Sequence, residues 1–248
     1  VLAKNEVGLH NLYRLVSKAH IDYLAEVPKV PRSEINNLRE GLLIGSACFN
    51  GEIFEIASHK NLNSLKNAMA FYDYIEVQPL PNYIYLVNKG NFSSLDDIKK
   101  IVVDIVKTAD SVNKLVVATG DVHYAYKKEK IFRDVYISAK GIGGVPHPLN
   151  LNPYNKKDIP NYDSPDQHYR STDEMLEEMA FLGEEKAYEV TVTNTNLIAD
   201  SIDNIVPLPN NKLFTPTIDN VENKLRNLCY GNAKKLYGDP IPEPIKKR

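Results

Sequence analysis

The chain begins with a helical pattern of apolar positions. Within residues 7–20, apolar side chains recur at steps of three and four, which is the spacing of one buried helix face. These positions are Leu9, Leu12, Val16 and Ala19 or His20. Pro28 and Pro31 then interrupt the pattern, so we predict one amphipathic helix followed by a break.

Short apolar runs alternate with helical patterns over the next hundred residues. Residues 42–45, 72–77 and 115–118 predict buried strands, because they are apolar, aromatic or β-branched and are bounded by Gly, Pro or small residues. Helices are predicted over residues 52–57, 62–70, 95–109 and 127–139. The helix at 95–109 is the clearest, with Ser94 as its N-cap. This order is typical of an α/β fold with a parallel sheet and crossover helices. Three strands are too few to close a barrel, so an open sheet and a barrel with further strands upstream both fit.

The rest of the chain is predicted to be helical. From residue 141 the composition shifts to Gly, Pro, Asn, Asp and Tyr, and we interpret residues 146–170 as a linker loop. A capping-box pattern at residues 171–174 begins a helix, Gly183 interrupts it, and a longer helix follows. After a Pro-rich connector at 207–216, a last helix ends at Gly238. This part lacks an obvious core, so we expect it to pack against something outside the chain.

Composition narrows the function classes. Thirty basic and thirty-two acidic residues leave a net charge of −2, without the basic excess of a free-standing DNA-binding domain. Two scattered cysteines, Cys48 and Cys229, fit a reducing cytoplasm. The sequence contains neither a signal peptide pattern nor an apolar run of about 20 residues. We therefore expect a cytoplasmic protein with no membrane contact, and the start at Val1 suggests an excised piece.

The most specific chemical pattern is Asp121 and His123 directly after the third strand. Residues two apart in a strand project to the same side, roughly 6.5–7 Å apart. A carboxylate and an imidazole so placed suit a cation, and ligands of parallel α/β folds bind beyond the carboxyl ends of the strands. The alternative interpretation is a helix N-cap Asp beside a His that packs locally.

Two further side chains are candidate ligands. Cys48 follows the first predicted strand at the equivalent place, where a thiolate would be a soft metal ligand. Taken alone, it is better explained as a small buried hydrophobe. His20 ends the first helix, where a lone histidine usually interacts with the helix C-terminus. The remaining histidines, His10, His59, His147 and His168, fall on polar faces or in loops, and we assign them no role.

Several segments, taken in order, resemble one known family. Residues 2–12, 15–20 (LVSKAH) and 41–52 resemble the PHP domain of bacterial DNA polymerase III alpha subunits. Residues 71–79 (FYDYIEVQP) and 118–124 (ATGDVHY) resemble the PolC type in particular. Residues 170–176 and 181–187 are similar to the stretch that links that domain to the polymerase core. The resemblance runs along nearly the whole chain.

The resemblance implies a fold and a ligand set. PHP domains are distorted β/α barrels that hold metal ions at the carboxyl ends of their strands, and His20, Cys48, Asp121 and His123 fall on metal-ligand positions of the family. The opening His-x-His motif and the ligands that follow it are absent, because an inserted exonuclease splits the domain in PolC-type enzymes and this chain resembles only the part after it. Residues 1–145 are thus expected to be a partial PHP-type barrel, and 171–248 an all-helical extension leading toward the polymerase core.

The resemblance also implies cofactors and partners. The parent enzyme would be a DNA-directed DNA polymerase using Mg²⁺, whose catalytic carboxylates lie outside this chain. The PHP site would take Zn²⁺ or Mn²⁺ and, if complete, would suit phosphoester hydrolysis. Expected partners are the remainder of the polymerase chain (first half of PHP, exonuclease and palm) and, through the parent, DNA.

Two other functions compete with this one. The domain could be a structural module that braces the polymerase, with a vestigial metal site, or a free-standing PHP phosphatase, against which the helical tail and the missing ligands argue. Half a barrel would leave open strand edges, so we also expect the fragment to oligomerise or to rearrange an edge.

Overall fold

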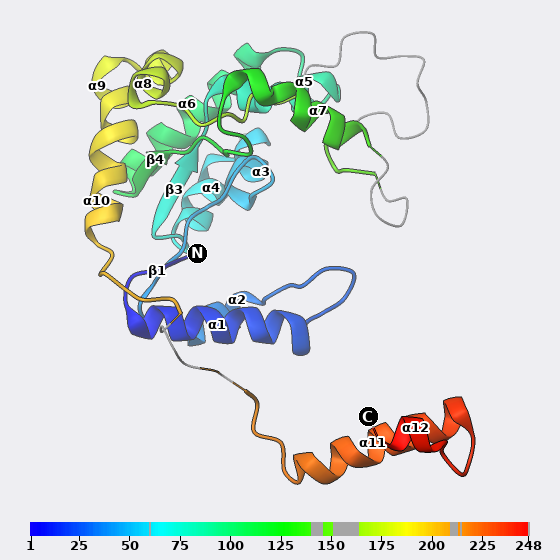
Figure 1. The fold of residues 1–248 in the computed structure, drawn as a ribbon. Helices are drawn as coiled ribbons and strands as arrows, with labels where there is room; N and C mark the ends of the chain where they lie inside the picture. Colours follow the sequence, from blue (N-terminus) through cyan, green and yellow to red (C-terminus); the bar gives the residue numbers. More distant parts are fainter. Residues whose placement is uncertain (60, 140–145, 151–163, 209–212, 214, 248) are drawn as a thin grey trace. The chain divides into compact units, whose positions relative to one another are not determined.

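A computed structural model describes residues 1–59, 61–139, 146–150, 164–208, 213 and 215–247 (Figure 1). The chain divides into two compact units, Val1–Ile205 and Val206–Arg248. Among the described residues, no helix has the length and apolarity that a membrane crossing requires.

The first unit holds all of the described strands. Its elements are, in order, β1 (Leu2–Ala3), α1 (Glu6–Ile21), α2 (Arg32–Asn37), β2 (Leu42–Leu43), α3 (Glu52–Ser58), α4 (Leu62–Met69), β3 (Tyr74–Val77), η1 (Leu80–Tyr83), α5 (Ile84–Asn88), α6 (Leu95–Ser111), β4 (Leu115–Ala118), η2 (Lys127–Glu129), α7 (Lys130–Ser138), α8 (Thr172–Met179), η4 (Ala180–Leu182), α9 (Glu184–Tyr188), η5 (Glu189–Thr193) and α10 (Asn194–Asp200). The helices and strands predicted between residues 52 and 139 are confirmed, with shifts of a few residues at their ends.

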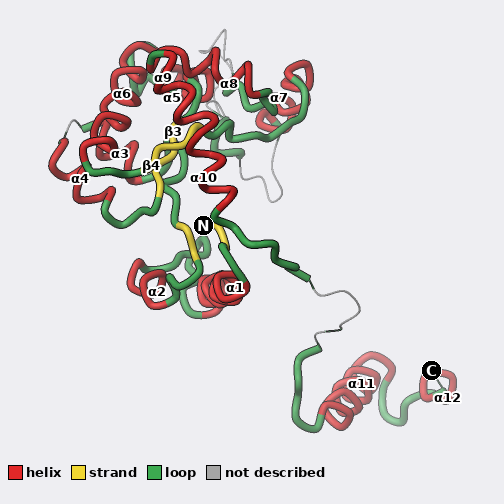
Figure 2. Tube along the Cα trace, turned by 90° about the vertical axis from the view of Figure 1, so that its left-hand side faces the viewer, coloured by secondary structure: helices red, strands yellow, loops and turns green. Residues whose placement is uncertain are grey.

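The sheet is smaller than predicted. β3 and β4 pair in parallel, with Tyr74 opposite Leu115 and Val77 opposite Ala118, as the α/β pattern predicts (Figure 2). The predicted first strand differs: Leu42–Leu43 pairs antiparallel with β1, a strand that the sequence analysis missed, and only Gly45 forms a parallel bridge to Tyr74. The described strands therefore form two separate pairs and no barrel.

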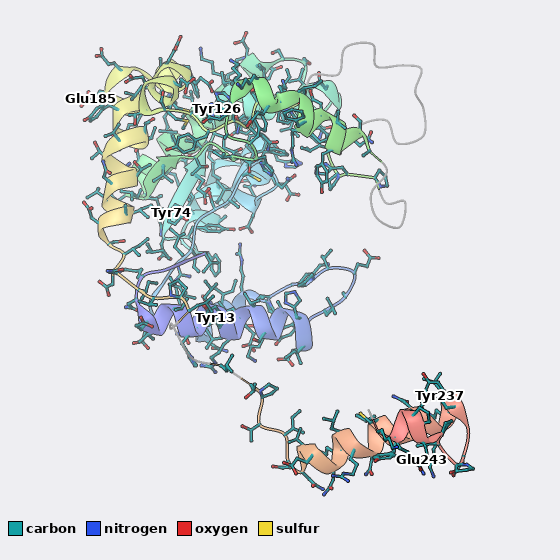
Figure 3. All side chains as sticks on the ribbon, viewed as in Figure 1. Tyr13, Tyr74, Tyr126, Glu185, Tyr237 and Glu243 are labelled. Atoms are coloured by element: carbon teal, nitrogen blue, oxygen red, sulfur yellow. The ribbon has the colours of Figure 1, made fainter. Side chains whose placement is uncertain are left out.

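Gly45 is required where the chain reaches β3. A Cβ on Gly45 would lie 2.4 Å from the Tyr74 ring, which is closer than any real contact. Tyr74 is labelled in Figure 3. The close approach of ring and backbone restricts this edge to a single bridge, and explains why the apolar run at 42–45 does not continue as a strand beside β3.

Both outer edges of the β3–β4 pair have partners. On β3, the Glu76 N–H donates to Ser46 Oγ at 2.8 Å and the Gln78 N–H donates to Tyr83 Oη at 3.1 Å. On β4, the Val116 carbonyl accepts from Asn194 Nδ2 at 2.8 Å, where α10 contacts the strand. Side chains thus pair some of the outward-facing backbone groups of both strands, and the expectation that the fragment oligomerises or rearranges an edge stays a prediction.

Helix α6 supplies much of the core and confirms its prediction. Ser94 Oγ accepts from the Asp97 N–H as the N-cap. Seven positions of α6 are buried: Ile98, Ile101, Val102, Ile105, Val106, Thr108 and Ala109. The six apolar ones, all except Thr108, pack in one cluster with residues of α3, α4, β3 and β4.

Helix α1 forms where predicted but buries a different face. Its buried residues are Gly8, Asn11, Leu15 and Ala19, whereas Val16 is 50% exposed. The reason is a backbone contact: a Cβ on Gly8 would lie 1.8 Å from the Gly41 carbonyl oxygen. The helix approaches the chain at Gly8 and buries the face that contains Gly8 and Leu15. Of the predicted stripe, Ala19 is buried and Leu12 is partly buried against the core, whereas Val16 is exposed.

Helices α8–α10 pack within the first unit. Met175, Met179, Ala187 and Val190 belong to its core. The predicted capping box at Ser171 and Glu174 and the break at Gly183, where φ is +90°, are both confirmed. The compact unit thus continues past residue 171. The assignment of 146–170 as a linker, of which residues 151–163 lie outside the described residues, and of 171–248 as a segment leading to a polymerase core remain predictions.

The second unit contains α11 (Val221–Tyr237) and α12 (Glu243–Lys246). Helix α11 ends at Gly238, where φ is +87°, as predicted. Tyr237, the last residue of α11, and Glu243, the first residue of α12, are labelled in Figure 3. No residue of α11 is buried, so this helix, unlike α8–α10, lacks a core of its own. The predicted connector at 207–216 lies partly outside the described residues.

Candidate functional site

The candidate site is the turn that follows β4. The Thr119 N–H donates to the Val77 carbonyl at 2.9 Å and extends the parallel ladder by one residue. At Asp121 the backbone then turns sharply, with φ at +48°. Asp tolerates this left-handed region better than most residues. Such conformations are maintained only where surrounding contacts fix them.

Asp121 and His123 lie together, as their spacing predicts. Asp121 Oδ1 is 3.8 Å from His123 Nδ1. His123 Nδ1 is 2.8 Å from the Asp121 carbonyl oxygen; if it donates there, Nε2 keeps its lone pair for another ligand, an arrangement common in metal-binding histidines. The side chains are 28% and 36% exposed, so the pair is accessible.

A second segment, residues 164–170, pairs with this turn. Tyr124 and His168 form a parallel bridge. The His123 N–H donates to the Gln167 carbonyl at 2.8 Å and the Tyr169 N–H donates to the Tyr124 carbonyl at 2.9 Å. Gln167 Nε2 donates to Asp121 Oδ2 at 2.6 Å. The end of the predicted linker is therefore an ordered and largely buried part of the site.

Arg170 anchors that segment. Its side chain is 1% exposed and its Nε donates to Glu178 Oε2 at 2.8 Å. Its Nη2 donates to Asn82 Oδ1 at 3.1 Å and to the Asp166 carbonyl at 2.9 Å. Asn82 Nδ2 in turn donates to the Gly120 carbonyl at 2.7 Å. Arg170 and Asn82 thus link η1, α8 and the residue that precedes Asp121.

His168 is also buried beside charged groups. Its Nδ1 lies 3.5 Å from Asp166 Oδ1 and its Nε2 lies 3.9 Å from Glu174 Oε1. Burial opposes ionisation of Asp166, yet the hydrogen bond from Tyr124 and the charges of His168, Lys130 and Lys127 together lower its pKa. Burial raises the pKa of Tyr124 to about 12, so its hydroxyl remains a donor to Asp166 at neutral pH.

Cys48 follows Gly45 in the direction of the carboxyl end of the sheet, the end at which the Asp121 turn lies. Gly45 pairs in parallel with β3, and β3 pairs in parallel with β4. The segment at 46–48 therefore runs toward the carboxyl end of β3 on one side, and the Asp121 turn follows the carboxyl end of β4 on the other side. The preceding residue, Ala47, has φ at +61°, and the Gly51 N–H donates to the Cys48 carbonyl at 2.7 Å. Cys48 is a free, partly buried thiol.

The structure does not bring all four predicted ligands together. His20 is exposed and its Nδ1 lies 2.8 Å from the Val16 carbonyl oxygen of its own helix. Over the described ranges, no group of three or more His, Cys, Asp or Glu side chains is arranged to hold a metal. A resident Zn²⁺ takes about three or four protein ligands. The donor types suit Zn²⁺ or Mn²⁺, but the described residues alone do not make a complete metal site.

Sequence reasoning missed the residues that surround the pair. Asn82, Gln167, His168 and Arg170 were assigned no role, although all four are buried. No local signal marks them, because polar residues such as those at 166–170 before a helix N-cap are equally expected of a solvated loop.

The chain matches known proteins at two levels. Residues 1–78 match the family model described as PHP domain, which confirms the predicted domain class at the N-terminus. Over all 248 residues the chain is 44% identical to the DNA polymerase III PolC-type of Halalkalibacterium halodurans, 42% identical to that of Listeria innocua and 42% identical to that of Bacillus subtilis.

The resemblance expected from the sequence is therefore confirmed: the chain begins with PHP-domain sequence and is similar throughout to PolC-type DNA polymerase III. It spans 16% of the length of each of these relatives. The PHP match ends at residue 78, so the extension of that domain to residue 145 remains a prediction.

Proposed function

We propose that this chain works as part of a PolC-type DNA-directed DNA polymerase and serves DNA replication. The observation that carries the proposal is the similarity over every residue of the chain to proteins named DNA polymerase III PolC-type. Nucleotidyl transfer with Mg²⁺ is proposed for the longer protein and not for these 248 residues alone.

A segment exchange tests this proposal. The matching segment of the Bacillus subtilis relative is replaced by this chain, and primer extension by the purified hybrid is measured. We expect extension at a rate near that of the parent enzyme, because 42% identity over the whole segment preserves its contacts with the rest of the polymerase. A hybrid that melts at the parental temperature but does not extend a primer would contradict the proposal.

We propose further that Asp121 and His123 are metal ligands of this polymerase, with Cys48 at the same sheet edge and His20 as additional ligands. Support comes from the 3.8 Å approach of the first two side chains and from the shared edge of Cys48. Zn²⁺ or Mn²⁺ suits this mixture of N, O and S donors. Further ligands would come from outside the described residues.

A bracing role is the second candidate. It is favoured because the described residues unite only two of the proposed ligands, while the turn that carries them is held by partly buried hydrogen bonds from η1 and from residues 164–170. Asp121→Asn in the hybrid polymerase separates the two candidates. Loss of phosphoester hydrolysis at an unchanged melting temperature supports chemistry, whereas a lower melting temperature without loss of hydrolysis supports bracing.

A further inference from the structure

Two groups of the Asp121 turn are held from outside the turn. The Asp121 carboxylate accepts a hydrogen bond from Gln167 Nε2 at 2.6 Å. The carbonyl of the preceding residue, Gly120, accepts from Asn82 Nδ2 at 2.7 Å and lies 3.5 Å from Arg170 Nη1. The side chain and the backbone of the turn are therefore fixed separately.

The turn needs such fixation because its backbone is strained. Asp121 has φ at +48°, a conformation that a non-glycine residue leaves readily when its surroundings permit. In an unsupported loop, the carboxylate would also rotate among its side-chain rotamers. Both motions would separate Asp121 Oδ1 from His123.

The Arg170 side chain is held rigidly and can therefore fix the conformation of the Asp121 turn. Its planar guanidinium is almost fully buried and donates to Glu178, Asn82 and the Asp166 carbonyl. A planar group with several fixed donors loses little further freedom when it binds its acceptors. Since Glu178 lies on α8, the support extends from the helix to the strand-end turn.

We propose that Gln167 and Arg170 are positioning residues for the Asp121–His123 pair. Arg170, through Asn82, holds the turn in its left-handed conformation. Gln167 occupies Asp121 Oδ2, so that Oδ1 stays free on the side of His123. This inference rests on the proposed role of Asp121 and His123 as ligands, and adds the residues that orient them.

The direct test is Gln167→Met, which keeps the size of the side chain and removes its amide. Mn²⁺ is titrated into the hybrid polymerase, which supplies the ligands that lie outside this chain, and free Mn²⁺ is followed by electron paramagnetic resonance; Asp121→Asn marks the sites that do not depend on the pair. We expect affinity to fall about 10–100-fold, as for other losses of a hydrogen bond that orients a metal ligand, at an unchanged melting temperature. Wild-type affinity in the variant would overturn the proposal.

Gln78→Met is the matched control. Gln78 and Gln167 are both 2% exposed, and the side-chain oxygen of each is buried without a partner. Gln78 follows β3 rather than β4, and its backbone N–H bonds Tyr83. The control loses an equally buried amide, so we expect its Mn²⁺ affinity to stay within about twofold of wild type. An equal loss in both variants would assign the effect to general packing and overturn the proposal.

A measurement without metal separates this inference from the proposed metal site. Three-bond Hα–Hβ couplings of labelled Asp121 report its rotamer. We expect one fixed rotamer in wild type and in Gln78→Met, and averaging in Gln167→Met. Averaged couplings already in wild type would overturn the positioning role. Fixed couplings in wild type, together with a hybrid polymerase whose Mn²⁺ affinity is unchanged by Asp121→Asn, would support the positioning of Asp121 and contradict the ligand role instead.

Discussion

Helices α6 and α11 are both 17 residues long, yet their surroundings differ completely. On α6, Ile98, Val102 and Ala109 are fully buried, whereas on α11 Leu225 is 60% exposed and Leu228 is 62% exposed. The spacing of apolar residues in the sequence predicts both helices. The spacing of apolar residues thus predicts a helix and its preferred face, but the burial of that face depends on which other segments of the chain pack against it.

The largest difference between the two helices should appear on truncation of an apolar side chain. Ile105→Ala in α6, at a position 2% exposed, is expected to destabilise the first unit by about 2–5 kcal/mol through lost burial and a cavity. Leu225→Ala in α11 is the matched control and should change stability by less than about 0.5 kcal/mol. Urea unfolding measures both. Equal losses would mean that α11 has a partner in solution.

A smaller contrast concerns buried and exposed asparagines. Asn194→Leu removes the donor to the Val116 carbonyl and leaves that β4 acceptor unpaired, at an expected cost of about 1–3 kcal/mol. Asn227→Leu on the exposed surface of α11 should stay within about 0.5 kcal/mol of wild type. If Asn194→Leu also made the protein dimerise in light scattering, the side chain would be confirmed as a block on the β4 edge.

The helix starts differ as well. Ser94→Ala removes the side-chain cap of α6 and should cost about 1 kcal/mol. Asn220, which precedes α11 with φ at +55°, accepts no hydrogen bond from a backbone N–H of the helix; its Oδ1 accepts only from the exposed Asn223 side chain. Asn220→Gly should therefore leave stability unchanged to within a few tenths of a kcal/mol. A loss at Asn220 as large as that at Ser94 would contradict the capping difference.

The smallest expected effect is a pH dependence at the start of α8. Hydrogen bonds from the backbone and side chain of Ser171 lower the pKa of Glu174 below its ordinary value of 4.5. A carboxyl with a lowered folded pKa stabilises the fold above the unfolded pKa, and this stabilisation is lost as pH falls through the folded pKa. The difference in melting temperature between wild type and Glu174→Gln should thus be present at neutral pH and disappear below 4.5. A difference that persists in acid would contradict this origin.

Local patterns could be read directly from the sequence. The stripe and cap of α6, the strand at 115–118 and the capping box at Ser171 all depend on neighbours within a few residues, and the structure confirms them. The proximity of Asp121 and His123 was predicted from strand geometry, but the structure produces it differently, because Asp121 lies in a left-handed turn beyond the end of β4.

Features that depend on distant contacts could not be predicted. The buried face of α1 is set by the approach of Gly8 to Gly41, and the antiparallel pairing of β2 requires a two-residue strand at the N-terminus. The support of Asp121 by Gln167 joins residues 46 positions apart. The apolar spacing within one segment carries no information about which distant segment pairs with it.

The bridge between Tyr124 and His168 has a consequence for how this protein tolerates changes in chain length. The chain leaves this end of the sheet after Tyr124 and returns to it at His168, so the two ends of the intervening segment are held side by side. Doubling the length of such a closed excursion costs only about 0.6 kcal/mol of closure entropy. Length changes within it that leave α7 (Lys130–Ser138) intact should therefore cost little stability, while residues 118–124 and 166–170 keep their spacing to Asp121.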